Sequence, residues 1–124
     1  MKIYVAHSRN FNFQNELYDP IKNSSLIANH TFIFPHEEKN ESFNSKELFQ
    51  NGCDLVIAEV SYPATGLGIE LGWADIMEIP IVCIYKKDSK VSGSLRVITN
   101  TLLEYSDSSD LIAKITQEIQ NLKP

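Results

Sequence analysis

The most constraining feature of the sequence is the stretch of residues 53–75, which has the pattern of a strand, a turn and a helix. Its first part, residues 54–60, is a nearly continuous apolar run rich in β-branched side chains. Such a run predicts a strand that is covered on both faces, as in a parallel sheet. Turn residues follow, since Pro63 fixes a backbone angle while Gly66 and Gly68 allow a ligand to approach the backbone closely.

The helix after this turn is predicted to begin near Leu67. The first N–H groups of a helix have no partner within it and point toward the preceding loop, so a phosphate can bind there, assisted by the Thr65 hydroxyl. Glu70 is predicted to lie in the same first turn, where the positive end of the helix dipole favours an ionised carboxylate. An ionised carboxylate in that position has the character of a nucleophile. The alternative is that Glu70 only satisfies a helix terminus.

Strand and helix patterns alternate along the rest of the chain. Strands are predicted at residues 2–6, 31–34, 54–60, 81–85 and 101–105. A helix is predicted at residues 11–22, with a disturbance at Pro20, and another at 45–51, with Asn44 or Ser45 as N-cap. A third runs from Leu67 to before Pro80, and a short one follows Gly93. The last helix is indicated by an apolar stripe of Leu111, Ile112, Ile115, Ile119 and Leu122. Because parallel neighbours need right-handed crossovers, this alternation predicts a flavodoxin-like α/β fold, a three-layer doubly wound parallel sheet of five strands in the order 2-1-3-4-5.

Length, charge and cysteine content narrow the class of protein. The 124 residues predict a single domain, residues 1–124. The net charge of −5 argues against binding to nucleic acid or a membrane surface, so the expected partner is a small molecule held by local donors. Cys53 and Cys83 fall in predicted strands without metal-ligand spacing, which predicts reduced thiols and a cytoplasmic protein. No metal site or cofactor is expected.

Two separate segments are predicted to meet at one crevice. In a doubly wound sheet the ligand crevice forms beyond the carboxyl ends of strands 1 and 3, where the winding reverses. The loop after the first strand contains His7, Ser8, Arg9 and Asn10, and the loop after the third strand is residues 61–68. The glycine-containing turn and Glu70 should therefore face the first loop across a shared cavity.

The same segments carry a resemblance to a known family. The motif P-x-x-G-x-G-x-E-L-G-x-A is formed by Pro63, Gly66, Gly68, Glu70, Leu71, Gly72 and Ala74. It resembles the signature of the nucleoside 2-deoxyribosyltransferase superfamily, which includes the 2'-deoxynucleoside 5'-phosphate N-hydrolases. The first strand, IYVAHS, is similar to the family's first strand at Tyr4 and Ser8, and a weaker similarity lies near Ser94.

This resemblance implies cleavage or transfer at the N-glycosidic bond of a nucleotide or nucleoside. Glu70 would attack C1' of the sugar as in a retaining glycosidase, and water or a second nucleobase would then accept the sugar. Tyr4 would position the nucleophile or the sugar. The residues implied at the 5' end are Ser8, Thr65, Gly66 and Gly68. Because transferases that prefer free nucleosides often have an acidic residue where Thr65 stands, the resemblance favours a 5'-monophosphate.

One departure from the family pattern motivates an alternative function. Counted without gaps, Lys46 occupies the place of an aspartate that assists at the sugar or base, and a lysine cannot act as a carboxylate acid or base. Glu47 or Asp54 would replace it after a register shift, whereas Lys46 itself would suit a phosphate contact. The alternative is a noncatalytic nucleotide-binding module. A third reading, an NAD-cleaving enzyme of the Toll/interleukin-receptor kind, is disfavoured by the glycine motif.

The remaining polar residues have both a site and a structural interpretation. Arg9 is a candidate phosphate ligand or a surface residue, and His36 either lines the crevice or is a solvated loop histidine. Ser94, or Ser92 in another register, resembles a serine that reaches the phosphate pocket of a neighbouring subunit, which implies a homodimer or a higher homo-oligomer. Trp73 is expected in a core or an interface.

Overall fold

The computed structural model describes residues 1–37 and 43–122. Within these ranges the strands are β1 (Lys2–His7), β2 (Thr31–Ile33), β3 (Leu55–Glu59), β4 (Ile81–Lys86) and β5 (Leu102–Tyr105). They form one sheet in the order β2-β1-β3-β4-β5, and all neighbouring strands are parallel. The flavodoxin-like α/β fold and the strand order predicted from the sequence are therefore confirmed.

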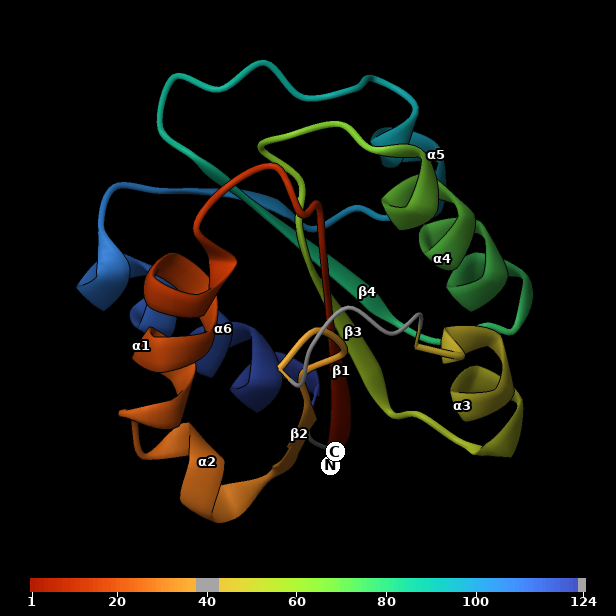
Figure 1. Cartoon of the computed structure of the whole chain (residues 1–124), viewed down its shortest axis with the longest axis horizontal. Helices are drawn as coiled ribbons and strands as arrows, with labels where there is room; N and C mark the ends of the chain where they lie inside the picture. Colours follow the sequence, from red (N-terminus) through yellow and green to blue (C-terminus); the bar gives the residue numbers. More distant parts are fainter. Residues whose placement is uncertain (38–42, 123–124) are drawn as a thin grey trace.

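Helices cover both faces of the sheet. They are η1 (Gln14–Tyr18, a π-helical turn), α1 (Asp19–Lys22), α2 (Leu26–Asn29), α3 (Ser45–Asn51), α4 (Thr65–Ile76), α5 (Leu95–Ile98) and α6 (Ser108–Leu122). In Figure 1, α1, α2 and α6 lie on one side of the sheet, and α3, α4 and α5 lie on the other. No helix within residues 1–37 or 43–122 is long and apolar enough to cross a membrane.

The central strand β3 explains why the apolar run shows no alternation. Leu55 and Ile57 pack in the core on the α1 and α6 side, whereas Val56 and Ala58 pack in the core on the α3 and α4 side. Successive side chains of a strand point to opposite faces, so a strand covered on both faces must be apolar at nearly every position. Glu59, which ends β3, is the exception and is completely buried.

The first helical segment differs from the prediction. The π-helical turn η1 precedes α1, and the N–H of Asp19 donates to the carbonyl of Gln14. Pro20 lies in the first turn of α1, where its missing N–H is not required, so the chain continues in helical form past it. The short helix α2 was not predicted, because four residues are too few to establish a helical period. Of the loop predicted at residues 35–42, residues 38–42 lie outside the described ranges.

The helix that carries Glu70 begins two residues earlier than predicted. Helix α4 starts at Thr65, its N-cap residue is Ala64, and no side chain caps it. The first turn contains no acidic residue, and Glu70 is in the second turn. The prediction that the helix dipole favours the ionised form of Glu70 is therefore wrong, because the dipole effect is confined to the first turn.

The two cysteines are free thiols. Cys83 lies in β4 and is buried, and burial raises the pKa of its thiol to about 12. Cys53 is half-buried and precedes β3, so its predicted place in a strand is wrong. Burial raises the pKa of Cys53 as well.

Candidate active site

A cavity of about 400 Å³ lies where the carboxyl ends of β1 and β3 meet the start of α4. Its walls come from the end of β1 and the loop after it, the loop before α3 with the first residue of α3, and the first three turns of α4. The described residues that line it are His7, Ser8, Arg9, Asn10, His36, Phe43, Ser45, Ala64, Gly66, Leu67, Ile69, Glu70 and Trp73. The expected meeting of the two loops beyond strands 1 and 3 is thus found in the structure.

Glu70 lies on the cavity wall and is bound from behind by a buried tyrosine. Tyr4 of β1 points toward α4 and is completely buried, and its hydroxyl donates to Oε2 of Glu70 at 2.5 Å. Glu70 itself is half-buried. One carboxylate oxygen is held by Tyr4, so the other is the natural candidate to face a bound ligand.

Burial, rather than the helix dipole, dominates the protonation of this carboxyl. Desolvation raises the pKa of Glu70, and hydrogen bonds from the hydroxyls of Tyr4 and Ser45 oppose that rise. Burial and the adjacent Glu70 raise the pKa of Tyr4 well above its ordinary range, so Tyr4 remains a neutral donor. The hydroxyls thereby supply the stabilisation of negative charge that was attributed to the helix terminus.

The site residues suggested by the sequence are divided between two cavities. Ser8, Arg9, Gly66 and Glu70 line the first cavity. Gly68 and Ser94 line a second cavity of about 320 Å³, between α4 and α5. The two cavities share Ala64 and Leu67, so they flank the first turn of α4.

Thr65 and Ser8, both implied at the 5' end, do not have the surroundings that were expected for phosphate ligands. Thr65 is exposed and lines neither cavity, so its expected assistance to a phosphate finds no support in the structure. The buried hydroxyl of Ser8 accepts the N–H of Asn10 at 3.0 Å and so helps to shape the loop after β1. Arg9 is exposed at the rim of the first cavity.

His7 ties three segments together at the floor of the site. Its Nδ1–H donates to the carbonyl of Ser8 at 2.7 Å, so its Nε2 accepts from the hydroxyl of Tyr18 at 2.5 Å. The same hydroxyl accepts the backbone N–H of His36 at 3.1 Å. Burial lowers the pKa of His7 to about 4, so the ring is neutral at physiological pH and acts as a fixed link.

His36 belongs to the cavity wall and is not a solvated loop residue. Its ring lies 5.4 Å from the ring of His7, and it is half-buried. Its Nδ1 is buried and has no hydrogen-bond partner within the described part of the chain. Burial lowers the pKa of His36.

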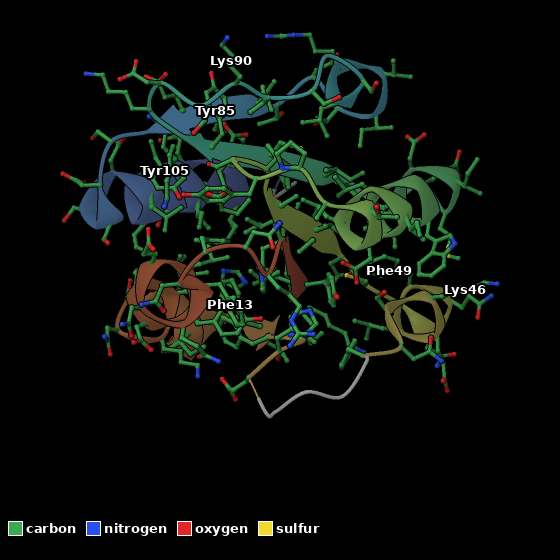
Figure 2. The ribbon with its side chains drawn as sticks, turned by 45° about the horizontal axis from the view of Figure 1, so that its top comes forward. Phe13, Lys46, Phe49, Tyr85, Lys90 and Tyr105 are labelled. Atoms are coloured by element: carbon green, nitrogen blue, oxygen red, sulfur yellow. The ribbon has the colours of Figure 1, made fainter. Side chains whose placement is uncertain are left out.

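The proposed substitutes for the missing aspartate do not reach the cavity. Lys46 is exposed and points into solvent (Figure 2), whereas the preceding Ser45 lines the cavity. Glu47 is exposed and accepts from the side chain of Asn44 at 3.2 Å. Asp54 accepts the N–H of Lys2 at the opposite end of β1.

Among the described residues that line the cavity, Glu70 is the one carboxylate. Trp73, expected in a core or an interface, also lines it. No group of three or more histidine, cysteine, aspartate or glutamate side chains in residues 1–37 and 43–122 is arranged to hold a metal ion.

The relatives found by comparison with known proteins all have the same name. No family model matches the sequence. A protein of Syntrophotalea carbinolica named "Putative 2'-deoxynucleoside 5'-phosphate N-hydrolase 1" is 36% identical over 127 residues, which cover 90% of this chain and 89% of the relative. Proteins of the same name from Methanosarcina barkeri and Methanosarcina mazei are 38% and 32% identical. Those matches cover 53% and 61% of this chain but only about half of each relative, 43% and 52%.

A solved structure has the same fold. The CMP N-glycosidase of Clostridium botulinum superimposes with a TM-score of 0.67, and the match covers 94% of this chain and 99% of that chain. The two sequences are 17% identical, so the likeness concerns the fold.

Proposed function

The chain belongs to the nucleoside 2-deoxyribosyltransferase superfamily, and from this membership we propose that it breaks the N-glycosidic bond of a nucleoside 5'-monophosphate. The near-full-length relative is named as a hydrolase of 2'-deoxynucleoside 5'-phosphates. The observation that carries the proposal is the Tyr4–Glu70 pair at the cavity wall, a carboxylate held in one orientation beside a space large enough for a ligand. Substrate cavities in proteins are of this size.

The proposed reaction is a double displacement at C1' of the sugar. The Glu70 oxygen that does not accept from Tyr4 forms a bond to C1' while the bond from C1' to the base nitrogen breaks, and the base leaves with the electron pair and takes up a proton. Water then attacks C1' of the glycosyl ester and releases Glu70, or a second nucleobase attacks and the reaction is a transfer. Tyr4 holds Glu70 and donates to the oxygen that does not attack.

The preference for a 5'-phosphate rests on the start of α4. The N–H of Gly68 donates to the carbonyl of Ala64, so the N–H groups that precede it have no partner inside the helix. Gly66 and Leu67 line the cavity at that point, and a β-carbon added to Gly66 would meet nothing within 4 Å. A phosphate is the ligand that a helix N-terminus favours. Arg9 at the rim adds a positive charge.

A noncatalytic nucleotide-binding module is the second candidate. It is favoured by the position of Lys46, because no carboxylate in the described lining accompanies Glu70 to protonate the departing base. The Ser45 hydroxyl and the His36 imidazole are the neutral groups at the wall that can hydrogen-bond a base. The two candidates differ in turnover and not in binding.

Chromatography of released bases tests the proposal. The protein should release free base from at least one deoxynucleoside or ribonucleoside 5'-monophosphate, and more slowly from the matching nucleoside. Adding a second base separates transfer from hydrolysis, and NAD serves as an unrelated glycosidic substrate. Thermal stabilisation by a monophosphate without release of base from any substrate would establish the binding module instead.

We also propose that the working unit is a homodimer in which Ser94 of a second copy approaches the phosphate site. In the single chain Ser94 lines the second cavity, on the other side of the first turn of α4. Large apolar side chains are exposed nearby, Ile76 on α4 at 83% and Val97 on α5 at 85%, and burying them would favour association. Sedimentation equilibrium should report a dimer. A fully active monomer would overturn the proposal.

A further inference from the structure

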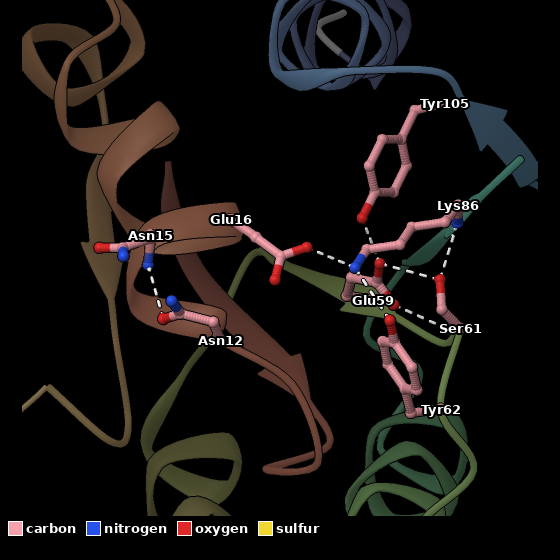
Figure 3. Close-up of polar contacts among 8 residues, drawn as sticks. All are labelled: Asn12, Asn15, Glu16, Glu59, Ser61, Tyr62, Lys86 and Tyr105. Atoms are coloured by element: carbon pink, nitrogen blue, oxygen red, sulfur yellow. Dashed lines mark hydrogen bonds and ion pairs between the residues drawn. The ribbon is translucent and has the colours of Figure 1, made fainter.

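Another carboxylate, Glu59, lies at the end of β3 and has no part in the reaction proposed above (Figure 3). Side chains at odd positions of β3 face α1 and α6, so Glu59 is on the opposite face of the sheet from the Tyr4–Glu70 pair. Its side chain is completely buried. Burying a carboxylate costs free energy unless its oxygens are hydrogen-bonded.

The carboxylate of Glu59 is satisfied by two residues from different elements. Its Oε1 accepts the backbone N–H of Ser61 at 2.7 Å, and its Oε2 accepts the hydroxyl of Ser61 at 3.0 Å. The hydroxyl of Tyr105, at the end of β5, also donates to Oε2. Burial raises the pKa of Glu59, and the bonds from Tyr105 and Ser61 and the charge of Lys86 oppose that rise.

Ser61, the second residue of the loop between β3 and α4, is held by contacts with both β3 and β4. The hydroxyl of Ser61 accepts the backbone N–H of Lys86 in β4 at 2.7 Å while it donates to Glu59. Ser61 is therefore fixed by its N–H to β3 and by its side chain to both β3 and β4.

The next residue of the loop, Tyr62, is also fixed. Its hydroxyl accepts from Nζ of Lys86 at 2.9 Å, and its ring stacks on that of Phe11 with a centroid distance of 5.0 Å. Lys86 is in turn paired with Glu16. Two residues after Tyr62 the chain reaches Ala64, the N-cap residue of α4.

The first turn of α4 needs this external support. Its N-cap residue offers no side-chain acceptor, and it contains two glycines, Gly66 and Gly68. Glycine loses more conformational entropy in a helix than any other residue, so local sequence favours this turn weakly. Contacts of the preceding loop must therefore determine where the first N–H groups of α4 point.

We infer that Glu59 is a positioning residue that, by holding Ser61, orients the first turn of α4 toward the 5'-phosphate of the ligand. The inference rests on the proposed function in that it places the phosphate at this turn. Glu59 touches neither ligand nor nucleophile. Its loss should therefore weaken the contribution of the phosphate to binding and leave the chemical step largely unchanged.

The test compares Glu59→Gln with Glu104→Gln, a control that removes the charge of an exposed carboxylate on β5. Titration calorimetry gives the dissociation constants of a nucleoside monophosphate and of its nucleoside. The ratio of the nucleoside's dissociation constant to that of the monophosphate measures the contribution of the phosphate to affinity. We expect this ratio to fall about tenfold in Glu59→Gln, as for the loss of one well-placed hydrogen bond, and to be unchanged in Glu104→Gln. If Glu59→Gln does not fold, Ser61→Ala removes the same side-chain link.

Hydrogen exchange without ligand provides an independent readout. Amides at residues 61–67 should exchange about tenfold faster in Glu59→Gln, whereas amides of β1 should not change. An unchanged ratio, an equal loss of affinity for nucleotide and nucleoside, or unchanged exchange at residues 61–67 would overturn the inference. Calorimetry and hydrogen exchange do not depend on turnover, so they test the role of Glu59 separately from catalysis. Absence of base release by the wild-type protein would instead reject the proposed catalysis.

Discussion

Glu70→Gln is expected to lower the rate of base release by at least about 10³-fold, because an amide cannot form the glycosyl ester. The substitution preserves the size of the side chain and an oxygen that can accept from Tyr4. Binding of a nucleoside monophosphate should change little, since the proposed phosphate contacts are one turn away at the start of α4. Single-turnover assays with the most rapidly cleaved monophosphate measure the loss.

The same substitution should not destabilise the fold. Burial raises the pKa of Glu70, which means that the surroundings disfavour its charge, so a neutral amide should give an equal or higher melting temperature. Glu47→Gln is the matched control, because Glu47 is exposed on α3 and lies outside the cavity. Retention of more than about a tenth of the wild-type rate in Glu70→Gln would be incompatible with a nucleophilic role.

Tyr4→Phe is expected to reduce kcat/KM by about 10²-fold near neutral pH, the effect of removing a hydrogen bond to a carboxylate that must stay ionised. The Tyr4 hydroxyl stabilises the charged form and so lowers the pKa of Glu70. Without it, the pKa of Glu70 rises further, and a larger fraction is protonated and inactive at a given pH. The rate should fall as pH decreases through that pKa.

The pH dependence of kcat/KM measures this effect directly. The acid limb of the Tyr4→Phe profile should lie at higher pH than that of the wild type, and activity should recover partly as pH rises. Tyr85→Phe is a suitable control, because Tyr85 lies on β4 and does not line the cavity. A uniform loss with an unshifted acid limb would mean that Tyr4 does not control the ionisation of Glu70.

The order of the strands could be predicted because it depends on local patterns and a general rule. Residues 54–60 are apolar at nearly every position, which indicates a strand inside a parallel sheet, and right-handed crossovers leave few arrangements for the others. Helix boundaries were harder to predict from the sequence. Ala64 gives no capping signal, so the start of α4 at Thr65 could not be read from side chains.

Only some of the residues that line the cavity could be predicted from the sequence, and the reason is geometric. Ser8 and Glu70 line the same cavity because the carboxyl ends of β1 and β3 are neighbours. Gly66 and Gly68 face different cavities because successive residues of a helix are rotated by about 100°, and two positions apart they point in different directions. A motif read as a string does not reveal this division.

The amino-acid sequence alone determined the parallel sheet, the order of its strands and the edge at which Glu70 lies, because periodicity and connection rules act along the chain. Only the tertiary structure decided what surrounds each carboxylate. Tyr4 is 66 positions from Glu70, and Tyr105 is 46 positions from Glu59. The ionisation of a carboxyl depends on desolvation and on donors within hydrogen-bond distance, and packing brings those donors from remote parts of the chain.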